Sequence, residues 1–191
     1  MIANLFSAVP ASAPERHPVD APAGACIHLV FGPQGAGKST YARALAGRER
    51  AVRLAIDDWM SDLFTPDVTG LPDPGWMFER VARCERRLRA TAADVLAAGT
   101  AVVLDIGGMR RSERDELARW ARGTGCPARR HWLDAPHALR EARVAARNAG
   151  RGPTFSFEVT PAMFAYMEHR FEPPAPEELA GAVVVDTAGG G

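Results

Sequence analysis

The sequence predicts an α/β domain in which a parallel sheet is covered by helices on both faces. From Ala25 onward, short apolar runs rich in Val, Ile and Leu alternate with longer stretches whose apolar residues recur at helical spacing. This alternation is typical of parallel strands joined by crossover helices. The expected strands are residues 26–31, 52–56, 101–106, 130–133 and 183–185. The expected helices are residues 38–46, 76–98, 112–123, 138–149 and 162–170.

Length and composition indicate one globular domain. The chain has 191 residues, of which 47 % are apolar and 24 % charged, and its formal net charge is zero. We expect residues 1–24 to form a flexible arm and residues 25–191 a single domain. No apolar run approaches the roughly 20 residues that span a bilayer, and a neutral chain has no overall field that attracts nucleic acid or membranes. The three cysteines lack metal-binding or redox spacing, so we expect a reducing, cytoplasmic setting.

The clearest motif is a glycine-rich loop between the first expected strand and the first expected helix. Residues 32–39 read Gly-Pro-Gln-Gly-Ala-Gly-Lys-Ser and fit the phosphate-binding pattern G-x-x-x-x-G-K-[ST] at every required position. The glycines allow close backbone approach, and the start of the helix directs N–H groups and a positive dipole end at phosphates. The expected nucleotide-binding residues are Gly32, Pro33, Gln34, Gly35, Ala36, Gly37, Lys38, Ser39 and Thr40.

Lys38 is the chain's only lysine and stands beside 22 arginines. A compact ammonium fits inside a phosphate-binding loop, whereas the broad, planar guanidinium does not. The one position that keeps lysine is therefore the position where the motif requires it. We expect Lys38 to reach the β- and γ-phosphates of ATP and the Ser39 hydroxyl to bind Mg²⁺. The alternative interpretation is a chance glycine-rich turn.

Two aspartates end expected strands and are candidates for chemistry. The carboxyl ends of parallel strands face the ligand crevice, so Asp57 and Asp105 should lie at the same edge as the phosphate loop. There Asp57 could accept the proton of an attacking hydroxyl, and Asp105 could hold Mg²⁺ or contact substrate. The alternatives are that Asp57 or Asp58 caps the next helix and that Asp105 is an ordinary turn residue.

Arginines and aromatic residues supply further candidates. Arg140, Arg143 and Arg147 recur at helical spacing, and we expect Arg143 and Arg147 to close over the transferring phosphate, whose charge spreads over three oxygens. A solvated basic face is the alternative for any one of them. A second basic run, at residues 80–89, is expected to be an exposed helix face. Trp59 lies in an aromatic group that could line an acceptor pocket, with a place in the core as the alternative.

Taken together, these residues resemble the small P-loop kinase family often labelled AAA-type ATPase, which is related to zeta toxins, chloramphenicol phosphotransferase and the kinase domain of polynucleotide kinases. The resemblance extends over about residues 27–178. It is carried by residues 32–40, 56–60, 103–107 and 171–174, with Arg114, Arg143 and residues 147–148. Of these, the phosphate-loop segment is highly specific, and the others are looser but occur in the right order.

The resemblance implies a three-layer P-loop NTPase fold with a kinase-type sheet of five parallel strands. It also implies Asp57 as general base and a lid at about residues 150–160, with Arg143 and Arg147 in or beside it. The expected substrate contacts are Asp58, Trp59, Asp105 and Arg114. Members of the family phosphorylate different acceptors, so the resemblance does not identify the acceptor.

Three functions follow as hypotheses. The first is a kinase that uses ATP and Mg²⁺ to phosphorylate a hydroxyl of a small molecule, such as an antibiotic or a nucleoside. The second is a polynucleotide 5′-hydroxyl kinase, which the neutral charge disfavours. The third is a nucleotide-dependent switch without an acceptor. Residues 105–108 match the D-x-x-G of switch GTPases, but the chain has no guanine-reading N-K-x-D segment. We expect a monomer or homodimer.

Overall fold

A sheet of five parallel strands forms the centre of the computed structural model, which describes residues 22–68, 73–150 and 158–189. The strand order is β2-β3-β1-β4-β5, with every neighbouring pair parallel. The strands are β1 (Ile27–Phe31), β2 (Val52–Ala55), β3 (Val102–Asp105), β4 (Ala128–Asp134) and β5 (Val183–Asp186). This order confirms the predicted α/β class and the kinase-type sheet, and each expected strand is present within two residues of its predicted start.

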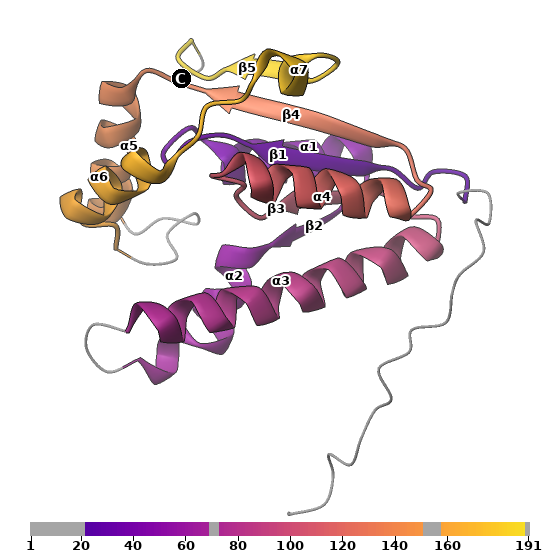
Figure 1. Ribbon diagram of the computed structural model, residues 1–191, viewed down its shortest axis with the longest axis horizontal. Helices are drawn as coiled ribbons and strands as arrows, with labels where there is room; N and C mark the ends of the chain where they lie inside the picture. Colours follow the sequence, from indigo (N-terminus) through magenta and orange to yellow (C-terminus); the bar gives the residue numbers. More distant parts are fainter. Residues whose placement is uncertain (1–21, 69–72, 151–157, 190–191) are drawn as a thin grey trace, which may run out of the picture.

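Helices cover both faces of the sheet. In Figure 1, α3 and α4 lie in front of it and α1 lies behind, while α2, α5 and α6 gather at the end where the strands end. The helices are α1 (Lys38–Glu49), α2 (Ile56–Leu63), α3 (Pro74–Ala97), α4 (Arg111–Gly123), α5 (His137–Gly150), α6 (Pro161–Arg170) and α7 (Pro176–Leu179), with a 3₁₀ turn at Thr65–Asp67. The sequence pattern predicts five of these helices and misses the short α2 and α7. The Asp73 side chain caps α3 by accepting from Trp76 N.

Alternation along the strands divides the core into two clusters. In β1, Ile27 and Leu29 face the cluster that α3 and α4 complete with Leu88 and Leu117. Val30, which follows Leu29, faces the opposite cluster, built mainly with α1. Because every residue of β1 is buried, this strand is fixed at the centre of the domain. The loop that follows it therefore begins from a rigid strand.

The strand order brings functional segments to one edge. With β1 between β3 and β4, the loop after β1 lies between the ends of those two strands, and α2 begins directly where β2 ends. The expected arm at residues 1–24 and the expected lid at about 150–160 fall mostly outside the described residues, so they stay predictions. Among the helices described, none is long and apolar enough to cross a membrane.

Candidate functional site

The loop after β1 has the backbone geometry of a phosphate cradle. Gly35 and Gly37 adopt φ values of 78° and 85°, which other residues rarely adopt. A Cβ on Gly35 would lie 2.5 Å from the carbonyl oxygen of Arg140, whereas a Cβ on Gly37 would meet nothing within 4 Å. Gly37 is also the N-cap of α1 and has no side chain to bond the first N–H groups of the helix. The open space and the free donors fit an anion at this point.

Lys38 is held over this loop. Its Nζ donates to the carbonyl oxygen of Pro33 at 2.9 Å, which links the first residue of α1 back to the second residue of the loop. Burial lowers the pKa of the Lys38 ammonium, and the nearby carboxylates of Asp105 and Asp57 counteract that effect. One ammonium therefore lies within electrostatic reach of both aspartates that the strand ends were expected to supply.

Asp57 is the second residue of α2, directly after the end of β2. The residue is exposed to solvent, yet desolvation is the largest cause of the raised pKa of its carboxyl. The carboxylate therefore has dense protein around it although the residue keeps contact with solvent, and we refer to the space beside Asp57, Lys38 and Arg147 as the recess. The neighbouring charge of Asp105 raises this pKa further, while Lys38 and Arg147 lower it. A carboxylate with a raised pKa in an accessible recess is suited to accept a proton.

Arg147 approaches the same recess from α5. Its Nε is buried without a hydrogen-bond partner in the described part of the chain. Desolvation lowers the pKa of its guanidinium, and the charge of Asp57 opposes that shift. Buried polar groups in proteins are nearly always paired, so an unpaired donor here indicates a place for an anionic ligand. The structure thus brings Lys38, Asp57, Asp105 and Arg147 together.

Asp105 ends β3 and is 7 % exposed. Its Oδ2 accepts from Nη2 of Arg53 at 2.7 Å and from Nε of Arg53 at 3.3 Å. The same guanidinium donates through Nη1 to Oδ2 of Asp58 at 2.7 Å. Asp58, expected to contact the acceptor, is instead bound to arginines, because Arg43 of α1 also lies 4.0 Å from its Oδ1.

Arg143 is bound to the segment after β5. It donates to the side-chain oxygen of Thr187 at 2.9 Å and to the backbone carbonyl of Thr187 at 2.7 Å. The Thr187 hydroxyl in turn donates to carbonyl oxygens of Ala36, in the phosphate loop, and of Asp134. Arg143 thus links the segment after β5 to the loop, and the expectation that it clamps phosphate stays a prediction. Arg147 is the arginine whose charge acts on Asp57.

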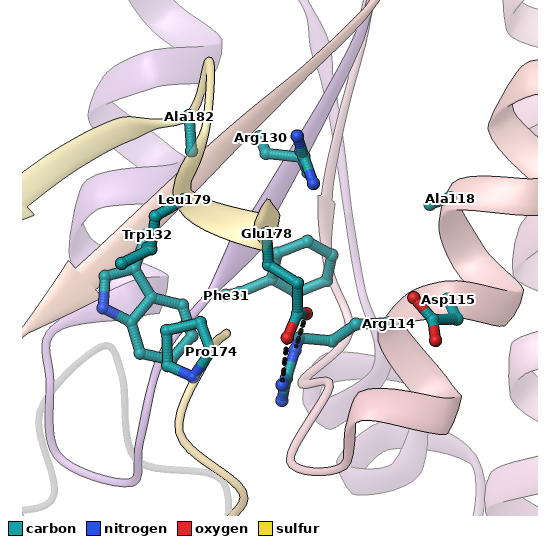
Figure 2. Close-up of a pocket in the computed structure, with 10 residues that line it drawn as sticks. All are labelled: Phe31, Arg114, Asp115, Ala118, Arg130, Trp132, Pro174, Glu178, Leu179 and Ala182. Carbon is teal, nitrogen blue, oxygen red and sulfur yellow. Dashed lines mark hydrogen bonds and ion pairs between the residues drawn. The ribbon is translucent and has the colours of Figure 1, made fainter. Parts of the chain in front are cut away.

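Arg114 is also engaged elsewhere. Its guanidinium binds both carboxylate oxygens of Glu178 at 2.7 and 3.1 Å, and it donates to backbone carbonyls of Gly108, Met109 and Glu172. Figure 2 shows this pair on the wall of a small pocket beside Trp132. With 4 % exposure and all these acceptors, Arg114 holds the chain after β3 against the C-terminal segment, and the expectation of a substrate contact has no support.

The remaining predicted residues have simpler surroundings. Trp59 is half-buried and packs against the main core cluster, which favours its core interpretation. Ser39 is partly exposed in the first turn of α1, and Thr40 next to it is exposed. Across the described ranges, no group of three or more His, Cys, Asp or Glu side chains could hold a metal ion. A magnesium ion held by Ser39 and Asp105 would complete its coordination with phosphate oxygens and water, as is usual for this ion.

Sequence reasoning missed Arg53, although a charged residue inside a short apolar strand that ends before two aspartates could have drawn attention to it. Arg140 was noticed only as a member of the arginine row, and its role in organising the site was not predicted. It is buried, donates to carbonyl oxygens of Gln34 and Ala135, and binds the carboxylate of Glu168 on α6. It therefore fixes the phosphate loop against α5 and α6.

Comparisons with known proteins bear on the family and the fold. A family model described as an AAA domain matches residues 27–174. No match to a curated protein was found.

Several solved structures share the fold. A protein described as a kinase, from Chloroflexus aurantiacus, is 23 % identical with a TM-score of 0.65, over 89 % of this chain and 90 % of that one. Kti12 from Chaetomium thermophilum, in complex with ADP-AlF₃, is 16 % identical with a TM-score of 0.62, over 86 % and 89 %. The APS kinase of Mycobacterium tuberculosis, in complex with AMPPNP and APS, is 18 % identical with a TM-score of 0.54, over 88 % and 90 %.

Proposed function

We propose that this chain, which belongs to the AAA domain family, is an ATP-dependent phosphotransferase. It moves the γ-phosphate to a hydroxyl of a small molecule, such as an antibiotic, a nucleoside or another metabolite. The observation that carries this proposal is the position of Asp57 in the first turn of α2, directly after β2, at the edge of the sheet where the phosphate loop also lies. The charges of Lys38 and Arg147 act on its carboxyl. A protein that only holds a nucleotide needs the loop and its lysine. It does not need a proton acceptor beside them.

Each residue of the recess has a distinct role in this reaction. Asp57 accepts the proton of the acceptor hydroxyl as the hydroxyl oxygen bonds to the γ-phosphorus and the bond from that phosphorus to its bridging oxygen breaks, releasing ADP. Lys38 and Arg147 stabilise the negative charge on the phosphoryl oxygens. Ser39 and Asp105 would hold Mg²⁺, which neutralises phosphate charge when it is bound.

A small acceptor fits the charge distribution better than a nucleic-acid strand. The helix α3 carries five arginines, which were the only basic run that suggested a path for a polynucleotide. Three of them are paired with glutamates: Arg80 and Arg83 with Glu79, and Arg89 with Glu85 and Glu116. Paired charges attract phosphates weakly, and the chain has no net charge to compensate.

The test is a transfer assay with Mg-ATP and a panel of acceptors: sugars, nucleosides, antibiotics with free hydroxyls, and a 5′-hydroxyl oligonucleotide. Mass spectrometry identifies a phosphorylated product, and ADP release gives the rate. We expect product from a small acceptor. We also expect Asp57→Asn to lose transfer by at least about 100-fold while ATP affinity stays within about twofold, because a general base acts in the transition state alone.

Other outcomes separate the competing functions. Phosphorylation of the oligonucleotide alone would replace the small-molecule acceptor with a nucleic-acid end. Slow ATP hydrolysis that no acceptor stimulates, and that Asp57→Asn leaves unchanged, would favour the switch and contradict the role of Asp57. Lys38→Ala is the matched control, since it should weaken ATP binding itself.

A further inference from the structure

We propose that Arg53 is a positioning residue for this site, which holds Asp105 and the first turn of α2 in the arrangement that Mg-ATP binding requires. The proposal rests on the proposed function for the role of Asp105 toward Mg²⁺. It assigns a task to a residue that lies outside the phosphate loop and outside the recess.

The location of Arg53 allows it to reach both targets. In the sheet, Arg53 is paired in register with Val103, and Ala55 with Asp105, so Arg53 lies two positions before the end of β2. Side chains two residues apart lie on one face of a strand. Arg53 therefore projects on the same face as Asp105 and runs toward the edge of the sheet where the site lies. Its side chain is 12 % exposed, and that of Asp105 is 6 % exposed.

One guanidinium joins two segments. Nε and Nη2 of Arg53 bind Oδ2 of Asp105, and Nη1 binds Oδ2 of Asp58, so each of its three nitrogens has a carboxylate partner. Asp58 directly follows Asp57 in the first turn of α2. The link therefore sets the position of the Asp57 backbone relative to the end of β3. Both contacts to Asp105 fall on Oδ2, which leaves Oδ1 unengaged by Arg53.

The charge balance explains why a cation is needed here. Three aspartates, at positions 57, 58 and 105, lie around the ends of β2 and β3, and Lys38 is already held to the phosphate loop. Without Arg53, the buried carboxylate of Asp105 would lose its nearest countercharge and would compete for Lys38. With Arg53 in place, Lys38 stays directed at the loop. A planar guanidinium can bridge two carboxylates, and a lysine ammonium lacks this fixed fork.

The test measures how strongly Mg²⁺ increases the affinity of the full chain for ATP, by calorimetry with and without the metal. In Arg53→Gln, we expect this increase to shrink by on the order of tenfold, as for other residues that orient metal-binding carboxylates. ATP affinity without Mg²⁺ should stay within about twofold, because the phosphate loop is intact. Arg53→Lys should show a smaller loss in the same direction. Arg83→Gln, which removes an exposed arginine paired with Glu79, is the matched control and should behave as the wild type.

Several results would overturn the proposal. One is an Arg53→Gln variant that melts as a folded protein and in which Mg²⁺ increases the affinity for ATP as much as in the wild type. Should Arg53→Gln fail to fold, Arg53→Lys decides: a wild-type Mg²⁺ effect in that variant shows that no bridge is needed. A wild type whose ATP affinity does not respond to Mg²⁺ also contradicts the idea. None of these measurements needs an acceptor, so failure to find any phosphorylated product would count against the proposed function and leave this test valid.

Discussion

A buried pair of histidines predicts how the stability of this protein depends on pH. Nδ1 of His28 in β1 lies 3.0 Å from Nε2 of His131 in β4, and the hydroxyl of Tyr41 lies 2.9 Å from Nδ1 of His131. Both histidines are almost fully buried, at 1 % and 4 % exposure. Burial, and then the neighbouring His28, lower the pKa of His131 from 6.5 to about 4. Burial also lowers the pKa of His28.

The direction in which stability changes with pH follows from proton binding. Because the pKa of His131 is lower in the folded chain than in the unfolded chain, the unfolded chain binds more protons between pH 6.5 and 4. The stability that the neutral His131 contributes is therefore fully present above about pH 6.5 and is lost as the pH falls toward 4. A shift of about 2.5 units corresponds to about 3 kcal/mol in total, of which about 2 kcal/mol is lost by pH 5. His28 acts in the same direction.

The assay is urea unfolding at pH 7 and pH 5 for the wild type and for His131→Gln. We expect the wild type to lose more stability between these two pH values than the variant does, by about 2 kcal/mol. Because each protein is compared with itself, a general destabilisation by the substitution does not affect the difference. His169→Gln removes an exposed histidine and should match the wild type. Equal losses in the wild type and His131→Gln would refute the reasoning.

Other predictions concern packing and the phosphate loop. Leu88→Ala, at a fully buried position in α3, should lower the free energy of unfolding by about 2–5 kcal/mol in urea, and a loss under 1 kcal/mol would contradict the core assignment. Gly37→Ala should lower the free energy of unfolding by about 1–2 kcal/mol, because alanine is strained at the positive φ of this position. Gly35→Ala should lower it more, because the added Cβ would also clash with the backbone of Arg140. A lower melting temperature for Gly37→Ala than for Gly35→Ala would contradict this. Thr187→Val removes the hydroxyl that joins Arg143 to the loop and should cost about 1 kcal/mol by chemical unfolding, and an unchanged midpoint would show that the link is dispensable.

The sequence predicts those parts of the site that depend on local geometry. The phosphate loop is a continuous segment whose glycines are required by its own backbone, so its position between a strand and a helix could be inferred directly. Asp57 and Asp105 could be placed because the carboxyl ends of parallel strands meet at one edge, wherever the strands stand in the sheet. The expected strand ends were correct to within about one residue, which was enough for this step.

Long-range partners could not be predicted. Arg143 and Arg147 lie one helical turn apart in α5, so spacing alone does not distinguish which of them contacts the phosphate. What separates them is Thr187, 44 positions further along the chain, which binds Arg143 and leaves Arg147 at the recess. In the same way, Arg114 is bound by Glu178, 64 positions away. These distances along the chain carry no pattern that a single sequence reveals.

The cations of this site divide into two kinds by the number of partners that each one has. Arg53, Arg140 and Arg143 each make two or more hydrogen bonds to fixed oxygens and hold segments of the site together. Among the residues that the structure describes, Lys38 has one bond, to a loop carbonyl, although an ammonium has three donors, and Arg147 has a buried Nε with no partner. Donors left unused at a buried position are costly unless a ligand takes them up. The two cations with unused donors are those beside Asp57, and this is where an incoming phosphate would satisfy them.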